Sequence, residues 1–203
     1  MNNVITSELI SKAYSYNSYK TLIKDLLLEN KTTGKNQSEK NIYFTRLNVQ
    51  RTKRIEKTTV INEELEKEVK AINHRLIFLV IAEAWCGDVA QNLPVINRIA
   101  ELNSFLELKI ILRDENENVM NEFLTNGGKA IPVCIIINPD NFEVTGRWGP
   151  RPAPAQEMTM EYKKTKAISH DELTKNIQLW YLKDKTQTIQ NEFLIILKNI
   201  KEN

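Results

Sequence analysis

The chain has 203 residues, of which 41% are hydrophobic and 27% are charged, and this suits one globular domain with additions. Its 28 basic and 26 acidic residues leave a net charge of +2, which gives no argument for nucleic-acid binding. The longest apolar runs have seven residues, far fewer than the ~20 that cross a membrane. Because no signal sequence is visible and two cysteines make no disulfide scaffold, we expect a cytoplasmic protein.

The first 70 residues are predicted to be helical and mostly polar. Within them, the segment 31–57 has eight basic and two acidic residues, a local charge of +6. We interpret it as a solvated face beside an acidic helix, in preference to a surface for an acidic partner or nucleic acid. Apolar periodicity and capping residues predict four helices, which begin near Ser7 (capped by Thr6 or Ser7), near Asn17, at Glu39 and after Asn62.

A different pattern begins at Arg75. A continuous apolar run predicts a buried strand at 76–81, and further strands are predicted at 106–112 and 133–137. Helices are predicted between the strands, through 89–100 and at 116–124. A hairpin is expected to join the third strand to a fourth at 142–145, through a turn at 138–141. This order predicts an α/β protein with a mixed sheet.

The C-terminal part begins with a proline-rich segment. Residues 149–154 are predicted to be irregular, because each proline lacks a backbone N–H and restricts the residue before it. Two further helices are predicted, from about Ser169 to Leu182 and from Thr186 to Ile200.

One of the two cysteines, Cys86, is predicted to lie where the first strand ends and a helix begins. Open α/β sheets place their functional sites at this edge. A cysteine at a helix N-terminus faces unpaired backbone amides, which favour the thiolate, and the thiolate is the nucleophile in disulfide exchange. Cys86 is therefore the candidate reactive residue.

Several motifs around this cysteine resemble thioredoxins. Trp85-Cys86-Gly87 after an apolar strand, with Pro94 in the following helix, resembles the thioredoxin active-site turn and its kinked helix. Ile131-Pro132 enters a strand after a glycine-containing loop and resembles the cis-proline of that fold. The resemblance implies that this proline faces the active-site cysteine. It also implies that the backbone of the preceding residue pairs with an extended substrate.

More closely, the chain resembles a family of bacterial thioredoxin-like proteins without an assigned substrate. This resemblance implies a thioredoxin-like fold, with a central mixed sheet flanked by helices and an N-terminal helical extension. We therefore predict a helical extension at 1–61, packed on a thioredoxin-like domain at 62–203. The motifs that carry the closer resemblance are Leu47-Asn-Val-Gln-Arg-Thr-Lys-Arg54, Glu83-Ala-Trp-Cys-Gly-Asp-Val-Ala-Gln91, Arg113-Asp114-Glu115-Asn116, Asn126-Gly-Gly-Lys-Ala-Ile-Pro132 and Trp148-Gly-Pro-Arg-Pro152.

Departures from the thioredoxin pattern suggest the mechanism. Asp88 stands where thioredoxins have a proline, and Val89 where they have the second cysteine, so a local resolving thiol is missing. Val80 stands where thioredoxins bury an aspartate that serves that thiol. We predict that Cys86 acts as a monothiol, resolved by an external thiol such as glutathione, bacillithiol or coenzyme A. No other cofactor is expected.

Three charged residues are predicted to modulate Cys86. Glu83 and Asp88 would raise the pKa of the thiol through their charge, although for Asp88 we favour a helix-capping role. Glu83 either accepts a proton or is a solvated carboxylate near Arg113. Arg113 either stabilises a thiolate or a substrate carboxylate, or it pairs with a neighbouring acid.

The remaining candidates are given structural interpretations. Cys134 is expected to be a small buried core residue, since free cysteine is among the most buried residue types. The loop 148–152 is interpreted as an exit loop, with Arg147 or Arg151 contacting an anionic ligand as the alternative. No metal site is expected, because Glu83, Cys86 and Asp88 offer one soft ligand.

The leading hypothesis is monothiol thiol–disulfide exchange with Cys86 as the nucleophile. Its partner would be a protein or small-thiol disulfide, and neither nucleic acid nor a membrane is expected. The alternative is a non-catalytic binding module that uses the groove around Trp85 and Pro132, with the basic helix 46–57 as a place to look for a partner. The third and least favoured hypothesis is a peroxide sensor in which Cys86 forms a sulfenic acid. The residues predicted to bind substrate are Trp85, Gly87, Ile131 and Pro132.

Overall fold

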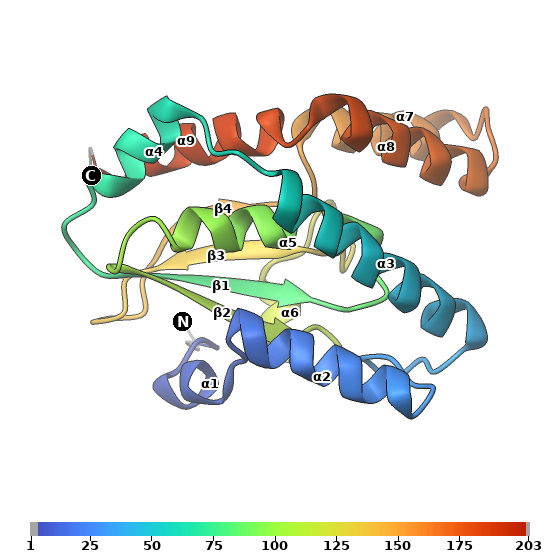
Figure 1. Ribbon diagram of the computed structural model, residues 1–203, viewed down its shortest axis with the longest axis horizontal. Coiled ribbons are helices and arrows are strands. Elements are labelled where there is room, and N and C mark those ends of the chain that lie inside the picture. The colour runs from blue at the N-terminus through green and yellow to red at the C-terminus, as the bar shows by residue number, and fades with distance from the viewer. Residues whose placement is uncertain (1–3, 202–203) are drawn as a thin grey trace.

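Four strands form one mixed sheet in the order β2-β1-β3-β4 in the computed structural model, which describes residues 4–201 (Figure 1). β1 runs parallel to β2 and antiparallel to β3, which pairs antiparallel with β4. β1 is buried along its whole length because it has a neighbouring strand on each side and helices above and below it. The strands are β1 (Leu76–Ala82), β2 (Leu106–Leu112), β3 (Val133–Ile137) and β4 (Val144–Trp148).

Helices surround this sheet. α5 contacts β1, β2 and α9, and α3 lies against α5. The helices of the described residues are α1 (Ser7–Lys12), α2 (Tyr16–Leu28), α3 (Glu39–Thr58), α4 (Glu63–Lys70), α5 (Gly87–Ala100), α6 (Glu117–Glu122), α7 (Ala153–Thr165), α8 (His170–Asp184) and α9 (Gln187–Lys201). None of the helices in residues 4–201 has the length and apolar character that a membrane crossing requires.

The predicted α/β class is confirmed, and the strands predicted at 106–112 and 133–137 have those bounds. The predicted caps Thr6 and Asn62 accept hydrogen bonds from the backbone N–H groups of Leu9 and Leu65. These elements could be predicted because their signals are local.

Two predictions in the C-terminal half are wrong. The strand predicted at 142–145 begins at Val144, because the turn continues through Phe142, which has a positive φ of 57° and donates to the carbonyl of Asn138. The segment 149–154 is not wholly irregular, because α7 begins at Ala153. Pro154 lies in the first turn of α7, where a helix has no internal partner for the N–H that proline lacks.

The N-terminal helices share the core of the sheet. Tyr16 and Tyr19 of α2 and Ile55 of α3 belong to the same buried cluster as the strands. Before α2, the backbone of Tyr14 exchanges two hydrogen bonds of 2.8 Å with Ile110 on the outer edge of β2. Residues 4–58 are therefore integrated with the sheet by both apolar packing and backbone pairing.

The C-terminal helices form two groups (Figure 1). α9 packs on the sheet through Phe193, whose ring lies 5.9 Å from that of Phe78 and 5.7 Å from that of Trp148. α7 and α8 contact each other and make a second, smaller apolar cluster around Ile177. This pair of helices borders the N-terminal end of α5, close to Cys86.

Candidate functional site

Cys86 lies between β1 and α5, as the N-cap residue of that helix. Its thiol donates a hydrogen bond of 3.3 Å to the backbone carbonyl of Ile131, and the backbone N–H groups of Asp88 and Val89 also interact with the sulfur. The side chain is half-buried. The structure thus brings the predicted nucleophile to the predicted Ile131-Pro132 segment, 45 residues further along the chain.

The loop that faces Cys86 is held by a close backbone contact. The peptide bond between Ile131 and Pro132 is cis, as is that between Gly149 and Pro150. Gly149 has a φ of 118°, and a Cβ atom added to it would lie 2.3 Å from the carbonyl oxygen of Pro132. Glycine is therefore required at position 149 both by its backbone conformation and by this approach.

Asp88 forms a largely buried ion pair and does not cap the helix as predicted. Its Oδ2 atom accepts hydrogen bonds of 2.6 and 3.0 Å from the guanidinium of Arg151, and Oδ1 accepts one of 2.8 Å from the hydroxyl of Tyr181. The side chains of Arg151 and Asp88 are 14% and 12% exposed. The loop 148–152 is thus tied to the start of α5, and Arg151 already has an anionic partner within the protein.

These neighbours disfavour the thiolate of Cys86. Burial, followed by the charge of Asp88, raises the pKa of the thiol to about 12. The backbone amides at the start of α5 and the charge of Arg151 oppose this shift but do not overcome it. At neutral pH the resting protein therefore holds Cys86 as a neutral thiol, which is consistent with its role as donor to Ile131.

Glu83 is not a solvated carboxylate near Arg113, and that alternative is wrong. It is completely buried, and its Oε1 atom accepts a hydrogen bond of 3.0 Å from the backbone N–H of Asp114. Burial raises the pKa of this carboxyl group. Gly34, in the loop before α3, approaches it so closely that an added Cβ would lie 3.0 Å from Oε2. Glu83 therefore faces the loop before α3.

Arg113 pairs with a neighbouring acid, which was one of the two alternatives considered from the sequence. Its guanidinium pairs with the carboxylate of Asp114 at 2.8 Å and lies over the ring of Trp85, 4.8 Å from the ring centroid. This stacking orients Trp85 beside the cysteine. The Nε1 atom of Trp85 is buried and has no hydrogen-bond partner among the described residues.

A cleft of about 890 Å³ opens at Cys86 between α3, α8 and the start of α5. Trp85, Gly87 and Asp88 lie along it, together with two arginines of α3, Arg51 and Arg54. The hydrogen-bond partners of these arginines are uncharged: Arg51 donates to the amide oxygen of Asn48 at 2.9 Å, and Arg54 to that of Gln91 at 3.2 Å. Both guanidinium charges are thus available to an anionic group that enters the cleft.

Sequence reasoning did not assign Arg51 and Arg54 to the site. Their spacing of three residues places them on one face of a helix, and this was the signal that could have found them. The residues of α8 that contact α5, by contrast, could not be recognised from any local sequence pattern. Gln178 accepts from Gln91 at 2.8 Å, and Tyr181 accepts from Asn92 at 2.8 Å.

Cys134 lies outside the site. It is fully buried in β3, opposite Val80 of β1 and Trp148 of β4, and burial raises the pKa of its thiol. The prediction of a core residue is confirmed. In residues 4–201, no group of three or more His, Cys, Asp or Glu side chains is placed to hold a metal ion.

Comparisons with known proteins support the fold. A family model described as Thioredoxin matches residues 34–166. A crystal structure of a protein of unknown function from Pseudomonas aeruginosa superposes with a TM-score of 0.62 at 16% sequence identity, over 95% of this chain and 96% of that one. A crystal structure of an HIV epitope scaffold gives a TM-score of 0.55 at 18% identity, over 91% and 98% of the two chains. No protein with a curated function matches.

Proposed function

We propose that this chain, which belongs to the thioredoxin family, carries out thiol–disulfide exchange with Cys86 as its single nucleophile. The observation that carries the proposal is the position of the thiol, at the N-terminus of α5 and 3.3 Å from the carbonyl of Ile131, in the wall of an open cleft. Cys134 is buried in the sheet, so the second step requires a thiol from outside.

The reaction proceeds through a mixed disulfide. The thiolate of Cys86 attacks one sulfur of the substrate disulfide, forms a new S–S bond and releases the other sulfur as a thiolate. Two molecules of a low-molecular-weight thiol then restore Cys86, release the second substrate thiol and leave as their own disulfide. Substrate is thereby reduced by two electrons and the external thiol is oxidised.

The surroundings suggest how a substrate is held. Trp85 and Gly87 line the cleft beside Cys86, whereas Ile131 and Pro132, which were also predicted to bind substrate, are buried and do not line it. A substrate therefore meets Trp85 first, and pairing with the backbone of Ile131 stays a prediction. The carbonyl of Ile131 now accepts from the thiol, so deprotonation of Cys86 frees it. Arg51 and Arg54 favour a substrate that carries a carboxylate or another anionic group near its disulfide.

Trapping of the mixed disulfide tests this proposal. After incubation of the Cys134→Ser variant with glutathione disulfide at mildly alkaline pH, mass spectrometry is expected to show one added glutathione. Reduced glutathione should then remove it. The Cys86→Ser variant, which keeps Cys134, is the matched control and should gain none. Absence of an adduct, or equal adducts in both variants, would contradict the proposal.

A second candidate is a binding module that keeps the groove without catalysis. It is favoured by one observation, the pKa of about 12 that burial and Asp88 impose on Cys86. Fewer than one molecule in ten thousand then carries the thiolate at neutral pH, since each pH unit below the pKa lowers that fraction tenfold. In this case the cleft and its arginines bind an anionic partner, and Cys86 only lines the wall.

The pH dependence of alkylation tests the pKa of Cys86, and comparison with Cys134 tests whether Cys86 reacts in the folded protein. With a thiol pKa of about 12, the rate at which iodoacetamide labels Cys86 is expected to rise about tenfold per pH unit from neutral pH to about pH 10, without levelling. Peptide mapping by mass spectrometry would follow Cys86 and Cys134 separately. Labelling of both cysteines at one rate would mean that unfolding gates the reaction and would favour the binding module. A plateau near pH 8.5 would show that the thiol is not perturbed as the structure indicates.

A further inference from the structure

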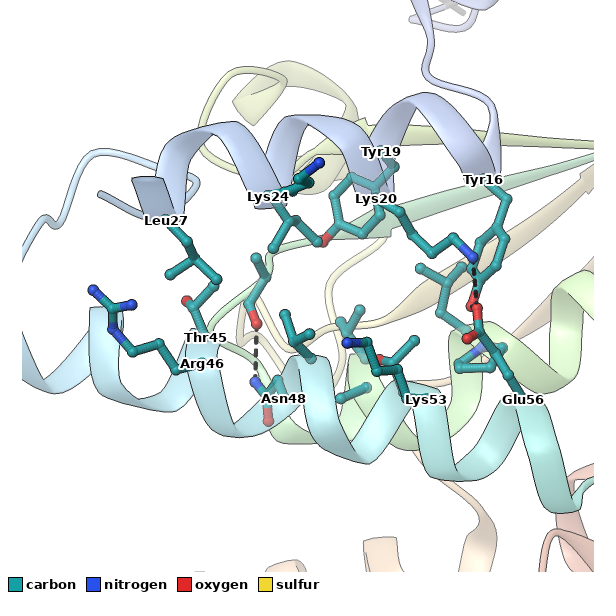
Figure 2. Close-up of a pocket in the computed structure, with 18 of the residues that line it drawn as sticks. Tyr16, Tyr19, Lys20, Lys24, Leu27, Thr45, Arg46, Asn48, Lys53 and Glu56 are labelled. Carbon is teal, nitrogen blue, oxygen red and sulfur yellow. Dashed lines mark hydrogen bonds and ion pairs between the residues drawn. The ribbon is translucent and has the colours of Figure 1, made fainter. Parts of the chain in front are cut away.

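A second cavity, of about 460 Å³, lies between α2 and α3 and is separate from the cleft at Cys86 (Figure 2). Its volume falls within the range of small-molecule sites, roughly 300–1,000 Å³. The walls are mainly apolar side chains from three helices, Ile23 and Leu27 of α2, Val49 of α3, and Leu93 and Pro94 of α5. Because the lining extends from Tyr16 to Leu28 along α2, the cavity is roughly 18 Å long at 1.5 Å per helical residue.

One polar group inside this cavity lacks a partner. Tyr19 is only 2% exposed, and its hydroxyl has no hydrogen-bond partner among the described residues. Figure 2 shows the hydroxyl directed from α2 into the space that α3 faces. Burial raises the pKa of Tyr19 well above its usual value, so the group remains a donor. An unpaired buried hydroxyl is unfavourable, and an acceptor bound in the cavity would satisfy it.

The residues around the cavity carry an excess of positive charge. Lys20, Lys24, Arg46 and Lys53 line it, against one acid, Glu56. Glu56 already accepts hydrogen bonds of 2.8 Å from Lys20 and from the hydroxyl of Tyr16. In the described part of the chain, no ion pair involves Lys24, Arg46 or Lys53. The cavity is thus elongated and apolar, and it has one buried hydrogen-bond donor and several basic side chains outside any ion pair of the described residues. These features are complementary to an apolar molecule with an anionic head.

We propose that this cavity binds a medium-chain aliphatic carboxylate. One carboxylate oxygen accepts from the hydroxyl of Tyr19, Lys53 on the facing helix supplies the countercharge, and the hydrocarbon chain lies along Ile23, Leu27 and Leu93. The site is built from α2, α3 and α5 and uses no atom of Cys86. Cys86 does not line it, although the charges of Glu83 and Cys86 contribute after burial to the raised pKa of Tyr19.

Calorimetric titration of the full-length protein with decanoate tests the proposal, and decanol provides the same chain without the charge. Decanoate is expected to bind at one site and decanol at least about tenfold more weakly, since hydrogen bonds to charged groups are the stronger ones. Tyr19→Phe should weaken decanoate binding about tenfold or more. Lys53→Glu should weaken it several-fold, whereas Lys57→Glu, one turn further along α3 and outside the cavity, should not. Cys86→Ser should bind decanoate as the unmodified protein does.

Thermal unfolding checks that these variants are folded. Tyr19→Phe removes a hydroxyl without a partner, so its melting temperature should not fall. A second variant, Val49→Trp, fills the cavity from α3 and should abolish binding while the melting temperature stays near that of the unmodified protein. Failure of decanoate to bind, equal binding of decanol, or binding that survives both Tyr19→Phe and Val49→Trp would each overturn the proposal.

Discussion

Replacement of Arg151 by leucine is expected to lower the free energy of unfolding by about 3 kcal/mol, the lower end of the range for buried pairs, because it leaves a largely buried carboxylate without its countercharge. The guanidinium contacts Asp88 at 2.6 and 3.0 Å, and the two side chains are 14% and 12% exposed. It also donates hydrogen bonds of 3.0 Å to Gln156 and Thr159 in α7. Chemical denaturation with linear extrapolation would measure the loss.

A double variant and an exposed pair make this prediction specific. Adding Asp88→Asn to Arg151→Leu removes the stranded charge and is expected to restore part of the lost stability. Arg98→Leu breaks an arginine–carboxylate pair that is 59% and 56% exposed, and should cost less than about 1 kcal/mol. Equal losses in Arg98→Leu and Arg151→Leu would show that the Asp88–Arg151 pair is not buried as described.

Asp88→Asn alone is expected to raise the rate of Cys86 alkylation at neutral pH about three- to thirtyfold. The charge of Asp88 raises the pKa of the thiol, and that of Arg151 lowers it, so removing the carboxylate lowers the thiol pKa. A nearby charge shifts a pKa by about 1–3 units. Each unit lost gives tenfold more thiolate of about threefold lower intrinsic reactivity, a net gain of about threefold. Alkylation kinetics with iodoacetamide would measure the change.

The controls for Asp88→Asn exclude two other causes. Cys134 is fully buried, so its labelling would accelerate together with that of Cys86 if the variant merely unfolded more often. Asp140→Asn makes the same substitution at an exposed position in the turn between β3 and β4, and should leave the rate at Cys86 unchanged. An unaltered rate in Asp88→Asn would mean that burial alone sets the pKa of the thiol.

The sequence predicted those parts of the fold whose signals are local. β3 could be placed because its apolar run ends at turn-forming residues, β2 because its apolar residues recur between Leu106 and Leu112, and Asn62 could be recognised as a cap. The helix α7 was not predicted, because prolines before and within its first turn have the same pattern as prolines that break a helix. Whether a proline ends or begins a helix depends on the residues after it, since the first turn has N–H groups to spare.

The site was predictable only in part. The position of Cys86 followed from the order of strand and helix, and its approach to Ile131 was implied by the resemblance to thioredoxins. The ion pair of Asp88 did not, because Arg151 is 63 residues away and Tyr181 is 93 residues away. The burial of Glu83 likewise depends on the backbone of Asp114, 31 residues further on. Partners at such separations are set by tertiary packing, which no local pattern encodes.

The backbone pairing of Tyr14 with Ile110 covers part of the open edge of the sheet. β2 is an outer strand of the sheet, and its unpaired backbone groups would otherwise be a template for a strand of another molecule. The segment between α1 and α2 occupies that position at Ile110, and α2 packs beside it. The N-terminal segment therefore covers the outer edge of β2. A chain shortened to begin at α3 is expected to expose this edge and to aggregate more readily.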